Sequence, residues 1–353
     1  MASQKSPELK QIEQIDIGFD FIDLFAGIGG TRIAFSDAGG RCVFGSEWDS
    51  HSRRTYFANF GEMPTGDITK LQMPEIPKFD VLVAGFPCQP FSSIGLRQGF
   101  RHKTQGTLFH NIAQIIESKG PSAFLLENVA GLETHDSGRT IQTISNVLGD
   151  LGYIVERKIL DAAEFGVPQH RRRMYIVGFK RRSFGAKFPM SWPAPSSRRV
   201  GIGKFVERNV SGYSISRHLQ RVYIFNDKKD NRPQVISTET TTPVKTLVAS
   251  YHKIQRLTGT FVRDGETGLR LLTENECRAI MGFPSTFKIP ESVSRTQMYR
   301  QYGNSVAVPV VRKIAFEMAQ VLFAKKVEKL VKKTGLLIDN SVDQRKSRSK
   351  RVA

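Results

Sequence analysis

The chain has 353 residues, a net charge of +19 and 39% hydrophobic residues, which excludes a disordered chain and allows a substantial core. Its three cysteines exclude a disulfide framework and none has zinc-site spacing, so we expect reduced thiols and no metal. No apolar stretch is long enough to span a bilayer, and the N-terminus MASQKSPELK lacks a signal-peptide pattern; we therefore expect a cytoplasmic protein.

The excess of Lys and Arg predicts a polyanionic partner, and nucleic acid is the first candidate. The alternative is a solubility surface or a basic tail such as RKSRSKR (345–351). HRRRMYIVGFKRR (170–182) is equally basic but lies within a segment that reads as folded, so the tail alone does not account for the charge.

Apolar segments and helical patterns alternate over the first 180 residues of the chain. The expected strands are 21–25, 41–49, 79–85, 123–129 and 173–179, and the expected helices are 31–39, 51–61, 110–120 and 140–153. This alternation predicts βαβ units and therefore an α/β fold with a doubly wound, mostly parallel sheet.

The pattern changes near residue 188, where prolines, serines and glycines replace the helical period. Residues 188–262 are polar and threonine-rich and predict a small β-rich domain. A helix and turn at 273–284 and a long amphipathic helix at 306–335 follow. We thus expect a first catalytic part (1–187), the small domain (188–262), a second catalytic part (263–335) and a basic flexible tail (336–353).

FIDLFAGIGG (21–30) reads as a strand, a glycine turn and the start of a helix, and such a turn lets a ligand approach the backbone. Glu47 ends the second strand, where a doubly wound fold places a carboxylate on ribose hydroxyls. Trp48 could stack on an adenine, and Asp67 could accept a hydrogen bond from its amino group. The alternative is an ordinary strand-to-helix turn with a surface acid.

DVLVAGFPCQPFSSIG (80–95) places Cys88 at the carboxyl end of a strand, between two prolines. Open α/β sheets bind ligands at this edge, and only a thiolate is a strong nucleophile, so Cys88 is a candidate catalytic residue. The following loop is glycine-rich and basic, which suits a lid that closes on a phosphate backbone. Glu127 ends the neighbouring strand and is a candidate acid with a raised pKa, although a strand-end turn is the simpler interpretation.

FIDLFAGIGG, GFPCQPFS, ENV, QHRRR and YGNSV, in this order, resemble the motif series of DNA (cytosine-5)-methyltransferases. RLLTENECRAIMGFP (270–284) is similar to a further block of that family. The resemblance covers nearly the whole chain except 188–262 and the termini, and it is strongest to the small bacterial enzymes of type II restriction-modification systems. Five ordered blocks make a chance match improbable, whereas any one alone is weak.

The resemblance implies the S-adenosylmethionine-dependent methyltransferase fold with S-adenosylmethionine as methyl donor. The residues that it assigns to the cofactor pocket are Phe25, Ala26, Gly27, Gly29, Gly30, Glu47, Trp48, Asp67, Pro87, Asn304, Ser305 and Val306. It further implies that Cys88 attacks C6 of a flipped-out cytosine, that Glu127 protonates N3, and that Arg173, with Arg171, holds the base at O2. Asn128 would brace the turn at Pro87 and Cys88.

The resemblance also implies that residues 188–262 recognise the target sequence in duplex DNA. Thr246 and Leu247 are similar to a short Thr-Leu element that positions the DNA, and Ser92 and Arg97 are the DNA-contacting candidates in the loop after Cys88. The family further implies a monomer that protects host DNA and accompanies a restriction endonuclease without forming a stable complex with it.

Three other functions remain open at this point. An RNA methyltransferase on the same framework has almost no recognition domain, so the long 188–262 segment favours DNA. A non-catalytic DNA-binding protein would not need Cys88, Glu127 and Arg173 together. A nicotinamide-dependent oxidoreductase fits poorly, because the glycine turn reads GxGG rather than GxGxxG.

Overall fold

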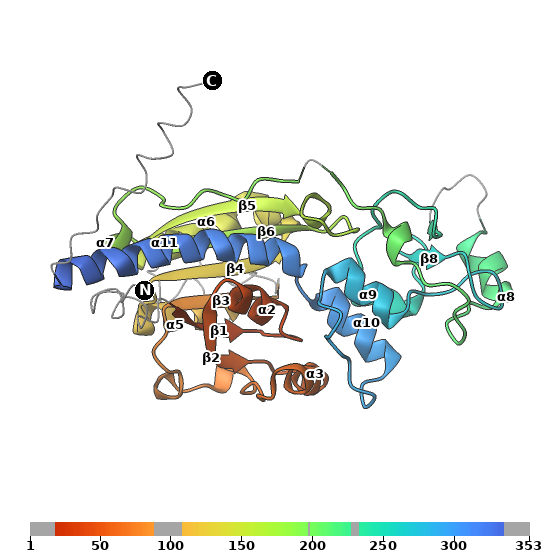
Figure 1. Cartoon of the computed structure of the whole chain (residues 1–353), viewed down its shortest axis with the longest axis horizontal. Helices are drawn as coiled ribbons and strands as arrows, with labels where there is room; N and C mark the ends of the chain where they lie inside the picture. The colour runs from red at the N-terminus through yellow and green to blue at the C-terminus, as the bar shows by residue number, and fades with distance from the viewer. Residues whose placement is uncertain (1–17, 88–107, 197, 227–232, 335–353) are drawn as a thin grey trace, which may run out of the picture.

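The computed structural model describes residues 18–87, 108–196, 198–226 and 233–334. Figure 1 shows a large lobe built on one sheet and a smaller lobe that contains β8, α8, α9 and α10. The long helix α11 runs across the sheet of the large lobe (Figure 1). No helix within the described ranges is long and apolar enough to cross a membrane.

The large lobe contains a six-stranded sheet with the order β2-β1-β3-β4-β6-β5. Its strands are β1 (Phe19–Leu24), β2 (Gly40–Ser46), β3 (Val81–Gly85), β4 (Ala123–Val129), β5 (Tyr153–Asp161) and β6 (Arg172–Lys180). β1 to β4 pair in parallel, whereas β6 pairs antiparallel with both β4 and β5. The predicted mostly parallel sheet is therefore confirmed.

Helices cover both faces of this sheet, as a doubly wound fold requires. They are α2 (Gly30–Asp37), α3 (Ser50–Phe60), α5 (Leu108–Lys119), α6 (Arg139–Asp150), the short α7 (Arg181–Phe184) and α11 (Val308–Thr334). Successive strand residues point to opposite faces: Val81 and Val83 join the core under α2 and α11, whereas Leu82 and Ala84 join the core under α5 and α6. Both faces of β3 are buried, which explains its continuous apolar sequence.

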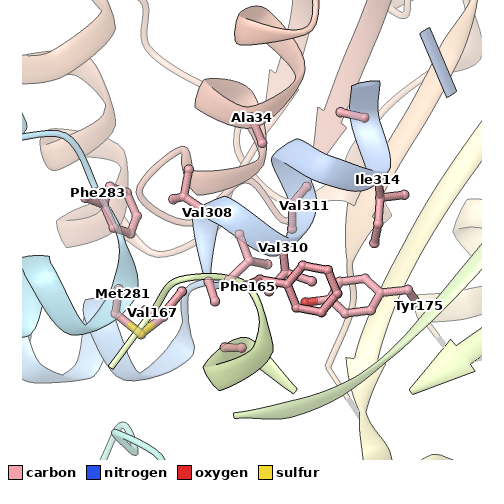
Figure 2. Packing of buried hydrophobic residues seen from close by; sticks show 14 of the residues in the cluster. Ala34, Phe165, Val167, Tyr175, Met281, Phe283, Val308, Val310, Val311 and Ile314 are labelled. Carbon is pink, nitrogen blue, oxygen red and sulfur yellow. The ribbon is translucent and has the colours of Figure 1, made fainter. Parts of the chain in front are cut away.

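Helix α11 is the main cover of one face. Figure 2 shows Val308, Val311 and Ile314 of α11 between Ala34 of α2 and Tyr175 of β6. This packing brings the segment just before α11 to the start of α2. The C-terminal part of the chain therefore packs against α2, the helix that follows the first strand.

Two elements of the structure are not predicted by the sequence pattern. β5 has a charged, exposed centre (Glu156, Arg157, Lys158) because it lies at the edge of the sheet, and this hides its strand character. Helix α10 (Arg295–Asn304) has a polar sequence, yet it buries Met298, Tyr299 and Tyr302. In both cases the tertiary position, rather than the local pattern, decides which side chains are buried.

The smaller lobe contains less strand than the sequence predicts. Over 188–262 the described strands are β7 (Gln234–Ile236) and β8 (Thr260–Val262), which pair in parallel, and the helix is α8 (Arg217–Leu219). A small core of Ile215, Ile224, Phe261 and Leu269 holds this lobe together. The remainder of this segment is irregular or forms short helical turns: η6 (Ile202–Phe205), η7 (Gln220–Ile224) and η8 (Tyr251–Lys253).

The large lobe also contains short helical turns: η1 (Ile68–Lys70), η2 (Met73–Glu75), η3 (Ala130–Glu133), η4 (His135–Gly138) and η5 (Ala162–Glu164).

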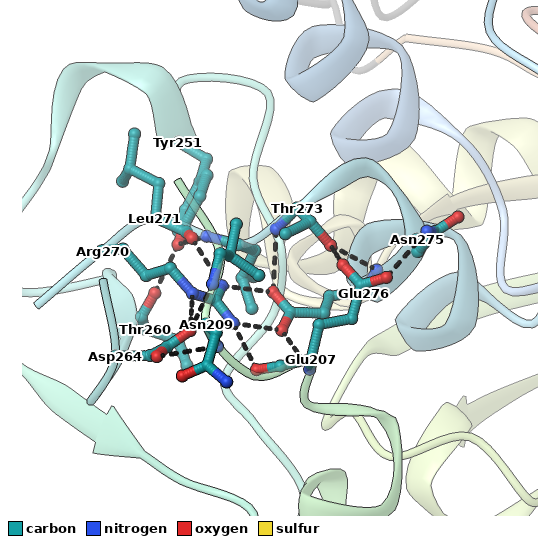
Figure 3. Close-up of polar contacts among 12 residues, drawn as sticks. Glu207, Asn209, Tyr251, Thr260, Asp264, Arg270, Leu271, Thr273, Asn275 and Glu276 are labelled. Atoms are coloured by element: carbon teal, nitrogen blue, oxygen red, sulfur yellow. Dashed lines mark hydrogen bonds and ion pairs between the residues drawn. The ribbon is translucent and has the colours of Figure 1, made fainter. Parts of the chain in front are cut away.

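A buried ionic network joins the 188–262 segment to helix α9 (Glu274–Met281) (Figure 3). The fully buried Arg270 pairs with Glu276 at 2.8 Å and with Asp264 at 2.9 Å, and it donates a hydrogen bond to the carbonyl of Glu207. Glu276 also completes the capping box of α9 with Thr273. α9 is thereby anchored to Glu207, within the 188–262 segment, and through Arg270 to Asp264, just after it.

Candidate active site

A cavity of about 680 Å³ lies at the carboxyl ends of β1 to β4, the edge at which open α/β sheets bind ligands. Its volume is within the range of pockets for cofactor-sized molecules. Eleven of the residues that the sequence assigned to the site line it: Phe25, Gly27, Glu47, Trp48, Asp67, Pro87, Glu127, Arg171, Arg173, Asn304 and Ser305.

Glu47 is buried at the end of β2 and closes the glycine turn. Its Oε2 accepts a hydrogen bond from the amide of Gly27 at 2.8 Å, and its Oε1 accepts one from the amide of Asp49 at 2.7 Å. Burial raises the pKa of the carboxyl, and these two backbone hydrogen bonds oppose the rise. Each carboxylate oxygen keeps a second lone pair, so Glu47 can still accept from ribose hydroxyls.

Trp48 and Asp67 offer the groups that an adenine needs. The Trp48 side chain is 70% exposed and leaves an aromatic face open at the cavity. Asp67 accepts from the amide and the hydroxyl of Thr69, and the backbone hydrogen bond lowers its pKa. Asp67 is therefore ionised at neutral pH and can accept from an exocyclic amino group.

The other four residues assigned to the pocket do not line the cavity. Gly29 and Gly30 pack closely instead: a Cβ on Gly29 would lie 2.2 Å from the Phe60 ring, and one on Gly30 would lie 2.9 Å from Val306. Ala26 and Val306 are buried. These residues shape the turn, which is bent by positive φ angles at Phe25 (56°), Gly27 (54°) and Gly29 (88°).

The opposite wall of the cavity comes from the end of α10 and the segment that follows it. Asn304 and Ser305 lie there as predicted, and Arg300, Gln301 and Gly303 join them. The sequence reasoning missed Arg300 and Gln301 because it did not predict α10. Asn128, expected to brace the turn before Cys88, also lines the cavity. The lining residues that were not expected are close to expected ones or lie in the first turn of a helix: Ser46, Asp49, Ser52, Ile68, Thr69, Gly85, Phe86, Leu108 and Val129.

Glu127 and Arg173 form an ion pair inside the cavity, with Oε1 and Nε 3.2 Å apart. β4 and β6 bring them together, because β6 runs antiparallel to β4 and its first residues reach the carboxyl end of β4. Burial raises the pKa of Glu127, while Arg173 and then Arg171 lower it. A carboxyl with a raised pKa beside a guanidinium can donate a proton and stabilise developing charge.

Cys88, Ser92 and Arg97 lie outside the described residues. Pro87, the residue before Cys88, lines the cavity. The carbonyl of Phe86 accepts a hydrogen bond from Nδ2 of Asn128 at 3.0 Å. Asn128 therefore holds the chain that leads into Cys88.

Arg171, Thr246 and Leu247 make contacts within the protein. Arg171 is 2% exposed and donates to main-chain carbonyls, and the Thr246 hydroxyl donates to the carbonyl of His170. Leu247 is 3% exposed and packs in the core, which suits support of the chain better than contact with DNA.

Comparison with known families identifies this arrangement. The C-5 cytosine-specific DNA methylase family matches residues 19–320, which include both lobes and every described wall of the cavity. The chain belongs to this family. The predicted family, fold and DNA (cytosine-5-)-methyltransferase activity are therefore confirmed, and the family's methyl donor is S-adenosylmethionine.

Individual members of the family are similar over most of the methylase chain. Type II methyltransferase M.MspI of Moraxella sp is 56% identical over 304 residues, which cover 86% of this chain and 71% of the relative. Type II methyltransferase M.BsuFI of Bacillus subtilis is 52% identical over 319 residues, covering 90% and 76%.

Solved structures share the fold at lower identity. A mutant DNMT2 of Spodoptera frugiperda superposes with a TM-score of 0.69 at 22% identity, covering 86% of this methylase and 99% of that chain. A putative DNA modification methyltransferase encoded within the prophage Cp of E. coli superposes with a TM-score of 0.60 at 21% identity, covering 86% and 99%.

Proposed function

We propose that this methylase transfers a methyl group to C5 of a flipped-out cytosine at a specific duplex sequence, through a covalent bond between Cys88 and C6. The observation that carries the proposal is that one cavity joins Glu47, the Glu127–Arg173 pair and Pro87, the residue before Cys88. A cofactor site, an acid and the approach to a nucleophile thus share one space.

The residues of the cavity fit S-adenosylmethionine. Glu47 would hold the ribose, Trp48 would stack on the adenine and Asp67 would accept from its amino group, with Asn304 and Ser305 on the opposite wall. When bound, this cofactor supplies an electrophilic methyl group on a sulfonium.

The protein must activate the cytosine, because C5 is a poor nucleophile. Addition of the Cys88 thiolate to C6 places electron density on C5, and Glu127 compensates charge at N3 as it develops. Arg173 keeps Glu127 in place and reaches the O2 side of the base. After C5 has taken the methyl group, with S-adenosylhomocysteine as the leaving group, a base removes the C5 proton and the Cys88 thiolate leaves C6.

The cytosine must flip out of the duplex, because the Cys88 thiolate cannot reach C6 while the base is stacked. The basic loop after Cys88, with Ser92 and Arg97, is our candidate for contacts to the opened duplex. We assign target recognition to residues 188–262, and Thr246 to the alignment of the DNA. The type II relatives support a role in protecting host DNA beside a restriction nuclease. We expect a cytoplasmic monomer.

Methylation of a plasmid followed by bisulfite sequencing tests the proposal. The wild-type protein should methylate one cytosine within one short sequence, and duplex DNA should accept far more methyl groups than tRNA. Cys88→Ala should abolish transfer and still shift DNA in a gel, whereas the matched variant Cys277→Ala, in α9, should remain active. Normal turnover by Cys88→Ala would reject the covalent mechanism.

A further inference from the structure

The segment before β6 pairs with residues 244–246 of the proposed recognition region. The amide of Val244 donates to the carbonyl of Pro168 at 2.9 Å, and the amide of His170 donates to the carbonyl of Val244 at 2.8 Å. The Thr246 hydroxyl donates to the carbonyl of His170 at 2.6 Å. Residues 168–170 and 244–246 therefore form a short ladder that holds the two lobes in register.

The buried side chain of Gln169 stabilises the same ladder through two hydrogen bonds. Its side chain is fully buried; Oε1 accepts from the amide of Leu247 at 2.7 Å, and Nε2 donates to the carbonyl of Ile280 at 3.1 Å. A buried amide with both ends bonded has no freedom to reorient. Any displacement of Leu247 must therefore displace the chain at 168–171.

Arg171 extends the connection to the wall of the cofactor cavity. Its Nη1 donates to the carbonyl of Leu247 at 3.1 Å, and its Nη2 donates to the carbonyls of Gly303 at 3.0 Å and Ser305 at 2.5 Å. One guanidinium thus bridges the proposed recognition segment and the loop that contains Asn304 and Ser305.

The electrostatics make this bridge rigid. Burial is the main cause that lowers the pKa of Arg171, to about 9, and Arg173 adds to it while Glu127 opposes it, so the group remains charged at neutral pH. The three carbonyls replace the water that a buried cation has lost. Moving either loop alone would remove part of this acceptor set from a buried cation, so the loops are expected to move together.

We propose that Arg171 is a positioning residue that couples the two ligands: target DNA held by the 188–262 segment tightens the binding of the cofactor beside Asn304 and Ser305, and the reverse. This inference rests on the proposed function, because it takes DNA and S-adenosylmethionine as the two ligands. Such a coupling is reciprocal by thermodynamic necessity and typically changes affinity by about 5- to 150-fold.

Calorimetry measures the coupling directly. The ligand is S-adenosylhomocysteine, the reaction product, which cannot transfer a methyl group. Its Kd is measured without DNA, with a saturating duplex that contains the target found by bisulfite sequencing, and with a scrambled duplex. For the wild-type protein we expect a Kd at least 5-fold lower with the target duplex than with the scrambled one, and the same factor for DNA affinity with and without the ligand.

The coupling factor is the Kd of S-adenosylhomocysteine with the scrambled duplex divided by its Kd with the target duplex. Arg171→Lys keeps a charge but cannot reach three carbonyls, so this factor should fall towards one. A role confined to stability would weaken both affinities and leave the factor unchanged. If Arg171→Lys does not fold, the matched pair Thr246→Val and Thr246→Ser decides: the valine variant loses the hydrogen bond to His170 and should lose coupling, and the serine variant keeps both.

The outcomes separate this inference from the proposed function. Failure of the wild-type protein to bind S-adenosylhomocysteine or to methylate DNA would reject the proposed function. Binding of both ligands by the wild-type protein with a coupling factor of one would reject only the coupling. A wild-type factor above one that stays unchanged in both Arg171→Lys and Thr246→Val would reject the role of Arg171 in it.

Discussion

At the scale of single residues, the two buried acids Glu47 and Asp23 differ in their hydrogen-bond partners and in their access to the cavity. Glu47 directly follows β2 and faces the cavity, and its oxygens accept from two backbone amides. Asp23 lies within β1 with no exposed surface, and the hydroxyl of Thr31 lies 2.8 and 2.7 Å from its two oxygens. Burial raises the pKa of Asp23 to about 7.

Replacement of Glu47 should weaken cofactor binding. Glu47→Ala removes a charged acceptor, and hydrogen bonds to charged groups contribute about 1.5–3 kcal/mol, so calorimetry with S-adenosylmethionine should show an affinity roughly 10- to 100-fold lower. Glu62→Ala, whose exposed side chain pairs with Arg32, is the matched control and should bind normally. Unchanged affinity in Glu47→Ala would remove Glu47 from the pocket.

Asp23 should make stability fall as pH rises. The folded protein holds the proton up to about pH 7, whereas the unfolded chain loses it near 3.8. Between these values the folded state binds more protons, so the free energy of unfolding decreases with pH, by an amount on the order of a few kcal/mol in total.

Asp23→Asn removes this titration. Urea unfolding at several pH values between 4 and 7 should show the variant gaining stability relative to the wild-type protein as pH rises. A constant difference across that range would mean that Asp23 does not hold its proton in the folded state.

At the scale of elements, the start of α2 depends on a residue without a side chain. A Cβ on Gly30 would lie 2.9 Å from Val306, 3.0 Å from Ser305 and 3.2 Å from Phe283. The first turn of α2 therefore contacts the loop before α11 directly, and this contact sets the distance between two walls of the cavity.

Gly30→Ala should separate these walls. Overpacking of this kind costs about 1–3 kcal/mol, and we expect a lower midpoint in urea together with weaker binding of S-adenosylmethionine. Gly149→Ala is the matched control, because a Cβ there meets no atom within 4 Å in α6; it should stabilise the protein by about 0.5–1 kcal/mol. Equal effects of the two substitutions would contradict the close contact at Gly30.

On the scale of the whole molecule, charge and specificity have different sources. The net charge of +19 attracts any phosphate backbone and carries no sequence information. Discrimination needs contacts to base edges, each worth about 1–3 kcal/mol, and these must come from a surface that the catalytic sheet does not constrain. We propose that residues 188–262 provide this surface.

Exchange of residues 188–262 for the corresponding segment of a relative with a different target should move methylation to the donor's sequence. A shorter exchange of 208–243 keeps Glu207, which binds Arg270, and the Val244–Leu247 ladder, and should fold with a Tm close to that of the wild-type protein. Bisulfite sequencing of a folded, active chimera that still reports the original target would assign recognition to the loop after Cys88.

The amino-acid sequence by itself determined the fold class and a large share of the residues that line the cavity. The carboxyl ends of parallel strands meet at one edge of a sheet. The sequence could therefore place together the groups at the ends of four strands: the glycine turn, Glu47, Pro87 and Glu127. Local patterns also determined the helix at 273–284, whose Thr273 and Glu276 form a capping box.

Only the tertiary structure decided the contacts of Arg171, the titration of Asp23 and the position of α10. The contacts of Arg171 with Leu247 and Ser305 span 76 and 134 residues of chain. No periodicity or spacing encodes such a contact, because it forms only when the small lobe and α11 close on the sheet. Burial in the folded chain removes water from both Arg171 and Asp23, and this desolvation lowers the pKa of Arg171 and raises that of Asp23.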